Sequence, residues 1–340
     1  MLAEKLYSYS KVSDIQSDIK NGSIKLEELV LSYLKRIKEN AELNAFIEVF
    51  EDEAISQAKQ IQEKIDKGTA GKLAGMVLGL KDNISYKNHK LAASSKILDG
   101  YEAVYSSTVV ERVLAEDAII IGRLNCDEFA MGASNETSYF GPVKNFADQS
   151  KVSGGSSGGS AVAVQAGLCL ASLGSDTGGS IRQPSAFCGV IGLKPTYARV
   201  SRHGIIAYAS SFDQVGPIAR SVEDAALILE VIAGPDNFDS TASKEPVPRY
   251  SQNLDNTTKR RIAYIEETLH SDGLDPEIKR NVLEQIASLK AQGHTVEPVS
   301  FEYLDHVVAA YYILTTAEAS SNLARYDGVH YGYKSEQSKD

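Results

Sequence analysis

One glycine- and serine-rich segment, residues 151–196, constrains the fold more than any other part of the chain. It contains ten of the chain's 26 glycines and two Gly-Gly-Ser turns, at residues 154–156 and 178–180. Glycine beside serine lets backbone N–H groups approach a ligand closely and adopt conformations that a Cβ would forbid. The apolar stretch between the turns, residues 161–173, is too short to span a membrane. Flexible linkers do not enclose such a stretch or carry an embedded Asp176 and Arg182, so we interpret the segment as a folded functional site.

The overall composition argues against several classes of protein. With 340 residues, 43% hydrophobic and 24% charged, the chain is typical of one large α/β domain or of two domains. A formal net charge of −10 without a block of basic residues argues against direct wrapping of nucleic acid. Three cysteines with no C-x-x-C spacing favour neither a disulfide scaffold nor a zinc site, and we expect no metal. The N-terminal residues lack an apolar signal core, so we expect a cytoplasmic location and no membrane association.

Helical and strand patterns alternate along the chain and predict an α/β fold with a central mixed β-sheet covered by helices on both faces. Residues 1–70 form an N-terminal helical arm, in which Ser23 caps one helix and residues 51–67 form a second. These helices could cover either the core or a partner subunit. We expect a single domain over residues 1–340, with a catalytic core at 71–235 and the rest of the α/β core at 236–340.

The finer pattern predicts the remaining elements. Ser221 is expected to cap a helix at residues 221–234. Further helices are expected at residues 108–116, 275–292 and 303–324, strands at 76–80, 118–122, 261–265 and 294–299, and loops at 125–139 and 200–219.

Lys81 directly follows the predicted strand at residues 76–80. Because an ammonium is costly to desolvate, this lysine either reaches the surface or is kept neutral by burial. None of the six histidines lies in the glycine-rich segment, and His203 is the nearest. The sequence also lacks G-x-S-x-G, H-E-x-x-H and P-loop motifs. A serine nucleophile here would need another base, and a neutral lysine can serve.

Three motifs at matching separations resemble the amidase signature family. They are GLKDN at residues 79–83, SGGSSGGSA at 153–161 and GSDTGGSIRQPSAFCGVIGLKPT at 174–196. Lys81 lies 75 residues before Ser156, which lies 24 before Ser180. Three further stretches, SSFDQVGPIARSV, DEFAMGASNETSYFGPVKN and NLARYDGVHYG, resemble one branch of the family, the A subunits of glutamyl-tRNA(Gln)/aspartyl-tRNA(Asn) amidotransferases. The resemblance covers essentially the whole chain.

The resemblance implies the amidase-signature fold and a Ser–cisSer–Lys triad. Ser180 would be the nucleophile, Ser156 would relay protons from a cis Gly155–Ser156 peptide, and Lys81 would be the neutral base. An oxyanion hole would be formed by the backbone N–H groups of Thr177, Gly178, Gly179 and Ser180. Supporting roles would belong to Ser157, Asp176 and Arg182, although a purely structural Asp176–Arg182 ion pair is equally compatible. Substrate contacts would come from Met131, Ser134 and Tyr311.

The same resemblance implies a glutaminase of the carbon–nitrogen ligase type, with glutamine as the amide nitrogen donor. It would supply ammonia for converting Glu-tRNA(Gln) to Gln-tRNA(Gln), and also Asp-tRNA(Asn) to Asn-tRNA(Asn), in a heterotrimer with B and C subunits. We expect no cofactor in this chain. The partner would use ATP and Mg and would hold most of the tRNA.

Several alternatives stay open at this point. Members of the family continue well past residue 340, so we expect a truncated or incomplete chain whose substrate pocket lacks groups of the C-terminal part. The chain could then be an inactive scaffold subunit, or it could be a stand-alone amidase acting on a small amide. A phosphate-binding module built on the two turns would leave Lys81 unexplained. Glutamine and asparagine both remain open as donors.

Overall fold

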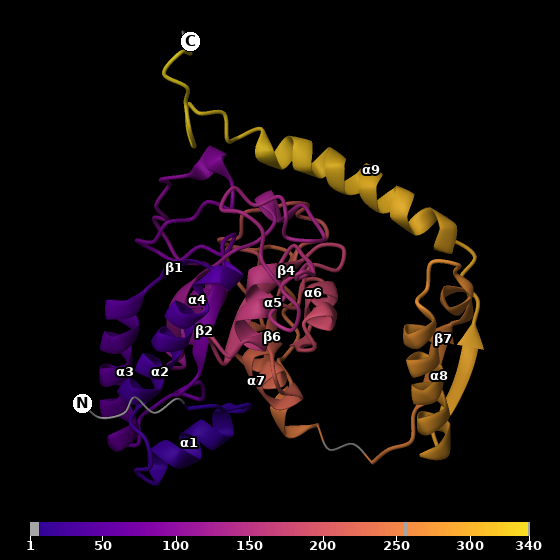
Figure 1. The fold of residues 1–340 in the computed structure, drawn as a ribbon, viewed down its shortest axis with the longest axis horizontal. Coiled ribbons are helices and arrows are strands. Elements are labelled where there is room, and N and C mark those ends of the chain that lie inside the picture. Colours follow the sequence, from indigo (N-terminus) through magenta and orange to yellow (C-terminus); the bar gives the residue numbers. More distant parts are fainter. Residues whose placement is uncertain (1–6, 255–256, 339–340) are drawn as a thin grey trace. The chain divides into compact units, whose positions relative to one another are not determined.

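A computed structural model gives the fold of the chain and describes residues 7–254 and 257–338 (Figure 1). Contacts divide the chain into two compact units, unit 1 (Met1–Ser251 and Thr315–Asp340) and unit 2 (Gln252–Leu314). The predicted segments 71–235 and 236–340 do not coincide with these units, and the single domain stays a prediction.

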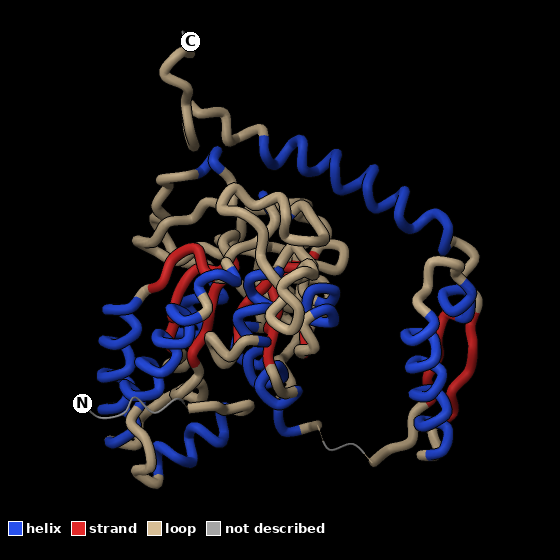
Figure 2. Tube along the Cα trace, viewed as in Figure 1, coloured by secondary structure: helices blue, strands red, loops and turns tan. Residues whose placement is uncertain are grey.

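Unit 1 is built on a mixed sheet with the strand order β1-β3-β2-β4-β6-β5 in the described residues (Figure 2). Strands β2 and β3 are parallel, as are β2 and β4, whereas β1, β5 and β6 pair antiparallel with their neighbours. The bounds are β1 (Phe46–Val49), β2 (Val77–Lys81), β3 (Ile119–Leu124), β4 (Ala171–Asp176), β5 (Ile191–Gly192) and β6 (Gln214–Ala219).

The central strands are apolar along nearly their whole length because both faces of the sheet are covered. Every residue of β2, β3 and β4 is buried, as expected for parallel strands with helices on their faces. Helix α5 packs on β2, β4 and β6, helix α7 packs on β6, and α3 packs on β3. The prediction of an α/β fold with a helix-covered central mixed sheet is therefore confirmed.

The apolar residues that α2 and α3 bury belong to the main core. These two helices pack together and α3 packs on β3, so the N-terminal arm covers this chain's own sheet. The bounds are α1 (Val12–Lys20), α2 (Leu26–Glu39), α3 (Glu51–Asp66), α4 (Thr108–Ala115), α5 (Gly158–Gln165), α6 (Arg182–Phe187) and α7 (Val222–Ile232). Short 3₁₀ helices are η1 (Ala41–Leu43), η2 (Lys96–Leu98), η3 (Glu128–Ala130), η4 (Tyr250–Gln252) and, in unit 2, η5 (Glu266–His270).

Two predicted helix caps have different outcomes. The Ser221 hydroxyl accepts a hydrogen bond from the Asp224 N–H, so its cap on α7 is confirmed. The predicted Ser23 cap is wrong, because α2 begins at Leu26 with Lys25 as the preceding residue. Ser23 instead donates its N–H to Asp18 C=O in the turn that closes α1.

Strand β6 is a second departure from the sequence prediction, which made residues 200–219 a loop. It lies between β4 and β5 and is fully buried. A Cβ on Gly216 would lie 2.1 Å from Leu193 O, so only glycine allows the chains to approach this closely. Pro217 has no N–H to donate, but its C=O still accepts from Leu193 N–H. The two residues that suggested a break in the sequence are therefore accommodated within the strand.

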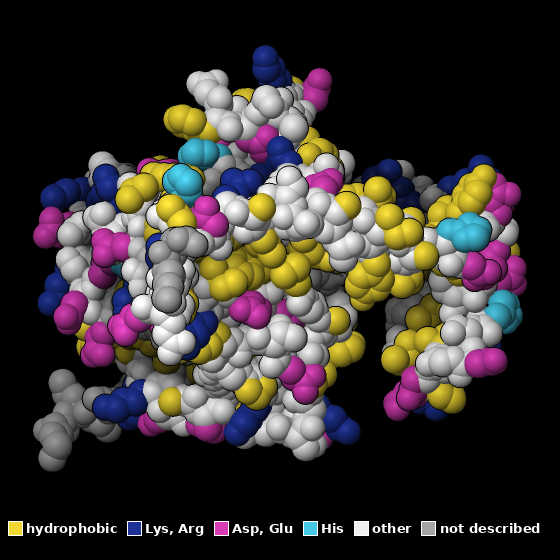
Figure 3. All heavy atoms as spheres, turned by 90° about the horizontal axis from the view of Figure 1, so that it is seen from above, with side chains coloured by type: hydrophobic (Ala, Val, Ile, Leu, Met, Phe, Trp, Pro, Cys, Tyr) yellow, Lys and Arg dark blue, Asp and Glu magenta, His cyan; other side chains and the backbone are white. Residues whose placement is uncertain are grey.

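Unit 2 contains the strands β7 (Arg261–Ile265) and β8 (Thr295–Val299), which pair in parallel, and helix α8 (Pro276–Ala291) between them in the sequence. These three elements match the predicted ones to within a residue or two. Helix α9 (Leu304–Leu323) begins in unit 2 and continues into unit 1 from Thr315. Hydrophobic side chains are exposed on the face seen in Figure 3, and the exposed apolar residues of α9 are Val307, Val308, Tyr312, Ile313 and Leu314.

The three cysteines, Cys126, Cys169 and Cys188, are free thiols buried in unit 1. Burial raises the pKa of each to about 12. They behave as small apolar groups, as predicted. In the part of the chain that the structure describes, no helix is long and apolar enough to cross a membrane.

Candidate active site

Lys81 is the last residue of β2, and its side chain is completely buried. Its ammonium nitrogen Nζ lies 2.7 Å from Ser156 Oγ, 2.9 Å from Ser175 Oγ and 3.4 Å from Ser175 O. Burial lowers the pKa of Lys81, while Cys126 and three nearby carboxylates, those of Asp127, Asp176 and Asp213, oppose this shift. Lys81 is therefore buried and does not reach the surface. Burial favours its neutral form, which can act as a base.

The neighbouring residue Asp82 faces the opposite way, as alternation along a strand requires. Its carboxylate accepts from Arg123 Nη1 at 2.6 Å and from the N–H groups of Ala92 and Ser94. Because this carboxylate is engaged with Arg123, it is not the partner of Lys81.

The first Gly-Gly-Ser turn precedes α5. Its Gly155–Ser156 peptide bond is cis, as predicted, and Ser156 is fully buried with its hydroxyl on Lys81. Gly154 has a φ of +76°, in the left-handed region that glycine adopts readily. The structure therefore brings together the predicted base and the predicted relay.

The second turn follows β4 and carries Ser180, which is 8% exposed. Ser157 N–H donates to Ser180 C=O at 3.1 Å, and Ser157 Oγ donates to Ser175 C=O at 3.1 Å. Ser157 thus joins the two turns, and its supporting role in the reaction stays a prediction. The described residues form no direct hydrogen bond between Ser156 Oγ and Ser180 Oγ, so the last step of the relay stays a prediction.

The Asp176 carboxylate accepts hydrogen bonds from residues in the second turn and just after it. Its buried carboxylate accepts from the N–H groups of Gly179 (2.9 Å) and Ile181 (3.0 Å) and from two nitrogens of Arg182, Nε at 3.1 Å and Nη2 at 3.0 Å. Burial alone would raise the pKa of Asp176, but Arg182 and the backbone N–H groups outweigh it and hold the pKa below its usual value. The Asp176–Arg182 pair therefore supports the turn and does not touch Ser180 Oγ.

The same contacts change the predicted oxyanion hole. Gly179 N–H, expected to point at the substrate, donates to Asp176 Oδ1 instead. Gly179 has a φ of +131°, a conformation that residues with a Cβ rarely adopt. Thr177, Gly178 and Ser180 remain the predicted donors.

The loop at residues 131–135 lies against the first turn. A Cβ on Gly155 would come within 3.0 Å of Ser134 N, so Ser134 is adjacent to the Gly155–Ser156 bond. Gln183 ties the two segments together, since Gly155 N–H donates to its Oε1 (3.0 Å) and its Nε2 donates to Ala133 C=O (2.8 Å). Met131 packs against a separate small apolar cluster around Phe129 and Leu98. The substrate roles predicted for Met131 and Ser134 stay predictions.

Tyr311, the third predicted substrate contact, lies in the part of α9 that belongs to unit 2. Its role likewise stays a prediction.

The sequence analysis missed two residues that contact the base or its partner. Ser175 accepts from Lys81 and also from Asn83 Nδ2 at 2.9 Å. Both residues stand inside the quoted motifs, Asn83 in GLKDN and Ser175 in GSDTGGS. Strand alternation could not find Ser175, because β4 was not among the predicted strands.

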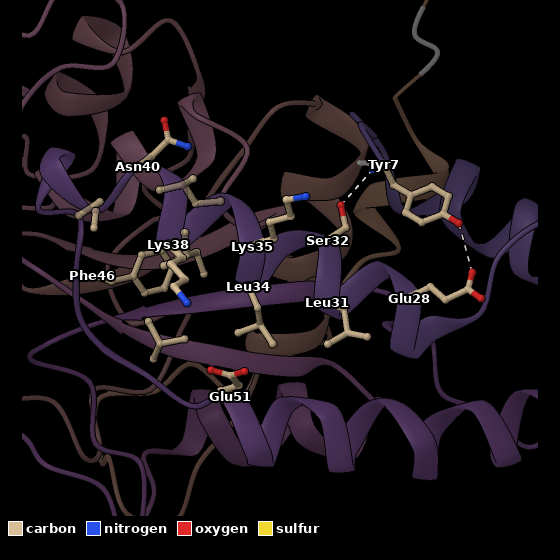
Figure 4. A pocket seen from close by; sticks show the side chains of 15 residues that line it. Tyr7, Glu28, Leu31, Ser32, Leu34, Lys35, Lys38, Asn40, Phe46 and Glu51 are labelled. Carbon is tan, nitrogen blue, oxygen red and sulfur yellow. Dashed lines mark hydrogen bonds between the residues drawn. The ribbon is translucent and has the colours of Figure 1, made fainter. Parts of the chain in front are cut away.

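A groove of about 970 Å³ lies elsewhere in unit 1, along α2, β1 and the start of α3 (Figure 4). Its lining includes Leu31, Leu34, Phe46 and Glu51, and none of the predicted catalytic residues. The walls of this groove bring together no nucleophile and base like the pair of Ser156 and Lys81. We therefore assign the chemistry to the buried serines and Lys81. Among the described residues, no cluster of three or more His, Cys, Asp or Glu side chains could hold a metal ion.

The family model named Amidase matches residues 28–340. The chain belongs to the amidase family. Its relatives in this family include a protein of Chlorobium phaeobacteroides (strain BS1) named as the A subunit of glutamyl-tRNA(Gln) amidotransferase, which is 48% identical over 334 residues. That match covers 98% of this chain and 70% of the relative. A relative of the same name from Salinibacter ruber is 49% identical, with 96% of this chain and 64% of the relative covered.

Solved structures of amidase-family proteins have the same fold. The A subunit of glutamyl-tRNA(Gln) amidotransferase from Thermotoga maritima matches with a TM-score of 0.78 and 36% identity, over 91% of this chain and 66% of that one. The peptide amidase from Stenotrophomonas maltophilia matches with a TM-score of 0.85 and 33% identity, over 96% of this chain and 69% of that one. The chain thus spans about two thirds of the length of its solved relatives.

Proposed function

We propose that this chain is the glutamine-hydrolysing subunit of a tRNA-dependent amidotransferase, with Lys81, Ser156 and Ser180 as its catalytic triad. The observation that carries the proposal is the fully buried Lys81, whose Nζ lies 2.7 Å from Ser156 Oγ between two Gly-Gly-Ser turns. A lysine whose pKa is lowered by burial can accept a proton near neutral pH, which is what a serine nucleophile needs.

In the proposed reaction, neutral Lys81 accepts the hydroxyl proton of Ser156 while Ser156 takes that of Ser180. Ser180 Oγ then attacks the side-chain amide carbon of glutamine, and backbone N–H groups of the second turn stabilise the oxyanion. The proton returns through Ser156 to the nitrogen as ammonia leaves, which gives an acyl-enzyme. Water, activated by the same Lys81–Ser156 pair, hydrolyses the ester to glutamate and restores Ser180.

The amidotransferase assignment is supported by relatives at 48–49% identity that carry this name. In this proposal the ammonia serves the conversion of Glu-tRNA(Gln) to Gln-tRNA(Gln), and also that of Asp-tRNA(Asn) to Asn-tRNA(Asn). Partner B and C subunits would complete a cytoplasmic heterotrimer. A partner subunit would use ATP and Mg and would hold most of the tRNA, in keeping with this chain's net charge of −10.

The test is a glutaminase assay on the 340-residue chain, alone and mixed with candidate B and C subunits. We expect glutamate release that depends on Ser180 and increases when the partners are present. Release that persists in Ser180→Ala would refute the triad. Ser180-dependent activity on other amides, unaffected by any partner, would refute the amidotransferase role.

A stand-alone amidase is the second candidate, and the match to a peptide amidase at a TM-score of 0.85 favours it. This enzyme would use the same triad on a small amide and would need no partner. Parallel assays with glutamine, asparagine and a C-terminal peptide amide distinguish the two candidates. A chain that hydrolyses none of them in any combination would be a scaffold subunit.

A further inference from the structure

Asp213 is a buried carboxylate that the proposed mechanism does not use. It directly precedes β6 and is 5% exposed. Thr177 Oγ1 donates to its Oδ1 at 2.6 Å, and the N–H groups of Tyr208 and Ala209 donate to its Oδ2 at 2.9 and 3.1 Å. Unlike Asp176, it is in none of the ion pairs that the described residues form. A carboxylate buried without a cation is costly, so its retention here requires an explanation.

The contact between Asp213 and Thr177 lies at the start of the turn that carries Ser180. Asp176 and Gln214 are opposite each other in the β4–β6 ladder, so Asp213 lies beside the point where β4 ends and the second turn begins. Asp176 holds the later part of that turn through Gly179 and Ile181. Asp213 holds its first residue, Thr177, from the neighbouring strand. The turn that carries Ser180 is thus attached to a separate carboxylate at each end.

We propose that Asp213 is a positioning residue for this reaction: through Thr177 it sets the orientation of the residue 177–180 backbone, and hence of the oxyanion donors beside Ser180. The inference rests on the proposed function, because it assumes that Ser180 is the nucleophile. Misplacing reacting groups by about 1 Å can lower a rate about a hundredfold, so loss of this contact should affect turnover more than substrate binding.

The charge of Asp213 should affect how the reaction rate depends on pH. Burial raises the pKa of Asp213 to about 6, although Thr177, the two N–H groups and Lys81 partly oppose the shift. In return, the negative carboxylate raises the pKa of Lys81. Removing that charge should therefore lower the pKa of Lys81 and also remove an ionisation near pH 6. The charged and titratable side chains around Asp213 come from several elements. They are Lys81 on β2, Asp176 on β4, Arg202, His203 and Asp239 in loops, Glu318 in α9 and Arg325 just after α9.

The experiment measures the rate at which a fluorophosphonate probe labels Ser180 in the full 340-residue chain between pH 4.5 and 9. This reaction needs the nucleophile, its base and the oxyanion donors, but no glutamine pocket. We compare wild type, Asp213→Asn, Thr177→Val and a matched control, Asp239→Asn. Asp213 and Asp239 line one cavity of about 250 Å³, but Asp239 pairs with Arg202 rather than with the turn. Ser180→Ala establishes the labelled site.

We expect Asp213→Asn to label about tenfold to a hundredfold more slowly at its plateau, with the acid limb displaced to lower pH. Thr177→Val should lower the plateau without displacing the limb to lower pH, because the carboxylate remains and loses only a hydrogen bond that lowers its pKa. Asp239→Asn should leave the plateau unchanged, because Asp239 pairs with Arg202 and not with the turn. Near-normal labelling in both Asp213→Asn and Thr177→Val would overturn the inference, as would an unmoved limb in Asp213→Asn.

Different results would overturn the proposed function and the positioning role of Asp213. Wild-type chain that is not labelled at Ser180 would overturn the proposed function and this inference with it. Labelling of Ser180 that ignores Asp213 and Thr177 would overturn the inference alone. If Asp213→Asn does not fold, Thr177→Val decides, because it removes the same hydrogen bond and leaves a side chain of similar shape. An unchanged plateau overturns the inference, and a lowered plateau with no displacement of the limb to lower pH supports it.

Discussion

In the first Gly-Gly-Ser turn the serine is hydrogen-bonded through both its side chain and its C=O, whereas in the second turn the described residues hold the serine through its C=O alone. Ser156 Oγ accepts from Lys81, but Ser180 is held through its C=O and through the Asp176 contacts to its neighbours Gly179 and Ile181. A proton relay must keep its hydroxyl on the base, while a nucleophile needs its hydroxyl free to reach the substrate. The two similar sequences therefore suit different catalytic roles.

The largest effect should come from exchanging the two serines for alanine. Ser180→Ala should lower kcat by about a millionfold and abolish acyl-enzyme formation, because the nucleophile itself is lost. Ser156→Ala should retain slow labelling by a fluorophosphonate, because the nucleophile is still present. Mass spectrometry of the intact protein checks both. Equal losses in the two variants would contradict the division of roles between the turns.

The next effect concerns the base. Activity should increase with pH through one ionisation below the usual pKa of a lysine, because burial lowers the pKa of Lys81 and only the neutral amine accepts a proton. Lys81→Ala should lose this limb and about a thousandfold or more of kcat. Lys81→Arg should be no better, since guanidinium stays protonated. Steady-state kinetics over pH 5–10 test this, and near-normal turnover in Lys81→Ala would exclude Lys81 as the base.

A smaller effect should follow from weakening the backbone support of the second turn. Asp176→Asn should lower the free energy of unfolding by about 2 kcal/mol at pH 7, since Arg182 is about half exposed and solvent screens that part of the pair. The folded pKa of Asp176 lies below its unfolded value of about 3.9. Its contribution is therefore present above pH 4 and is lost as the pH falls through the folded pKa.

Urea unfolding of wild type and Asp176→Asn at pH 7 and pH 3 measures this difference. Glu297→Gln, which breaks the exposed pair with Arg261, is the control and should change stability by less than about 0.5 kcal/mol. A difference between wild type and Asp176→Asn that grows as the pH falls would contradict the assigned sign.

The smallest effect should come from Gln183, which joins the first turn to the loop at residues 131–135. Gln183→Ala loses a hydrogen bond at each end and should lower stability by about 1–2 kcal/mol and kcat/KM by less than about tenfold. Gln183→Glu keeps the acceptor for Gly155 N–H but loses the donor to Ala133 C=O. If the two variants behave alike, the contact with the first turn contributes little.

The motifs predicted the centre of the site because the residues that react stand at defined separations in the sequence. The contact between Lys81 and Ser156 could be expected from the resemblance to the amidase signature motifs, whereas the predicted strand before Lys81 left open whether this lysine is buried. The supporting contacts could not, because they depend on which way each side chain points. Ser175 and Asp213 reach the site from β4 and from the start of β6, and the sequence analysis treated the residues of β6 as a loop.

The two errors in the predicted fold have different causes. Ser23 has a side chain that can cap a helix, but α2 begins only at Leu26, with Lys25 before it. Gly216 and Pro217 are residue types that often end a strand, but the close approach of Leu193 makes a glycine necessary within β6. In β6, therefore, a tertiary contact outweighed a local preference.

The three buried cysteines should react slowly with thiol reagents. A thiol whose pKa is raised to about 12 is almost entirely protonated at neutral pH and reacts slowly with alkylating reagents. Cys188 also donates its S–H to Ser153 C=O beside the first turn. Alkylation of Cys188 would therefore require the segment around the first turn to open, so the rate of alkylation would report how often this segment opens. A cysteine introduced on the surface could meanwhile carry a fluorophore with little background from the native three.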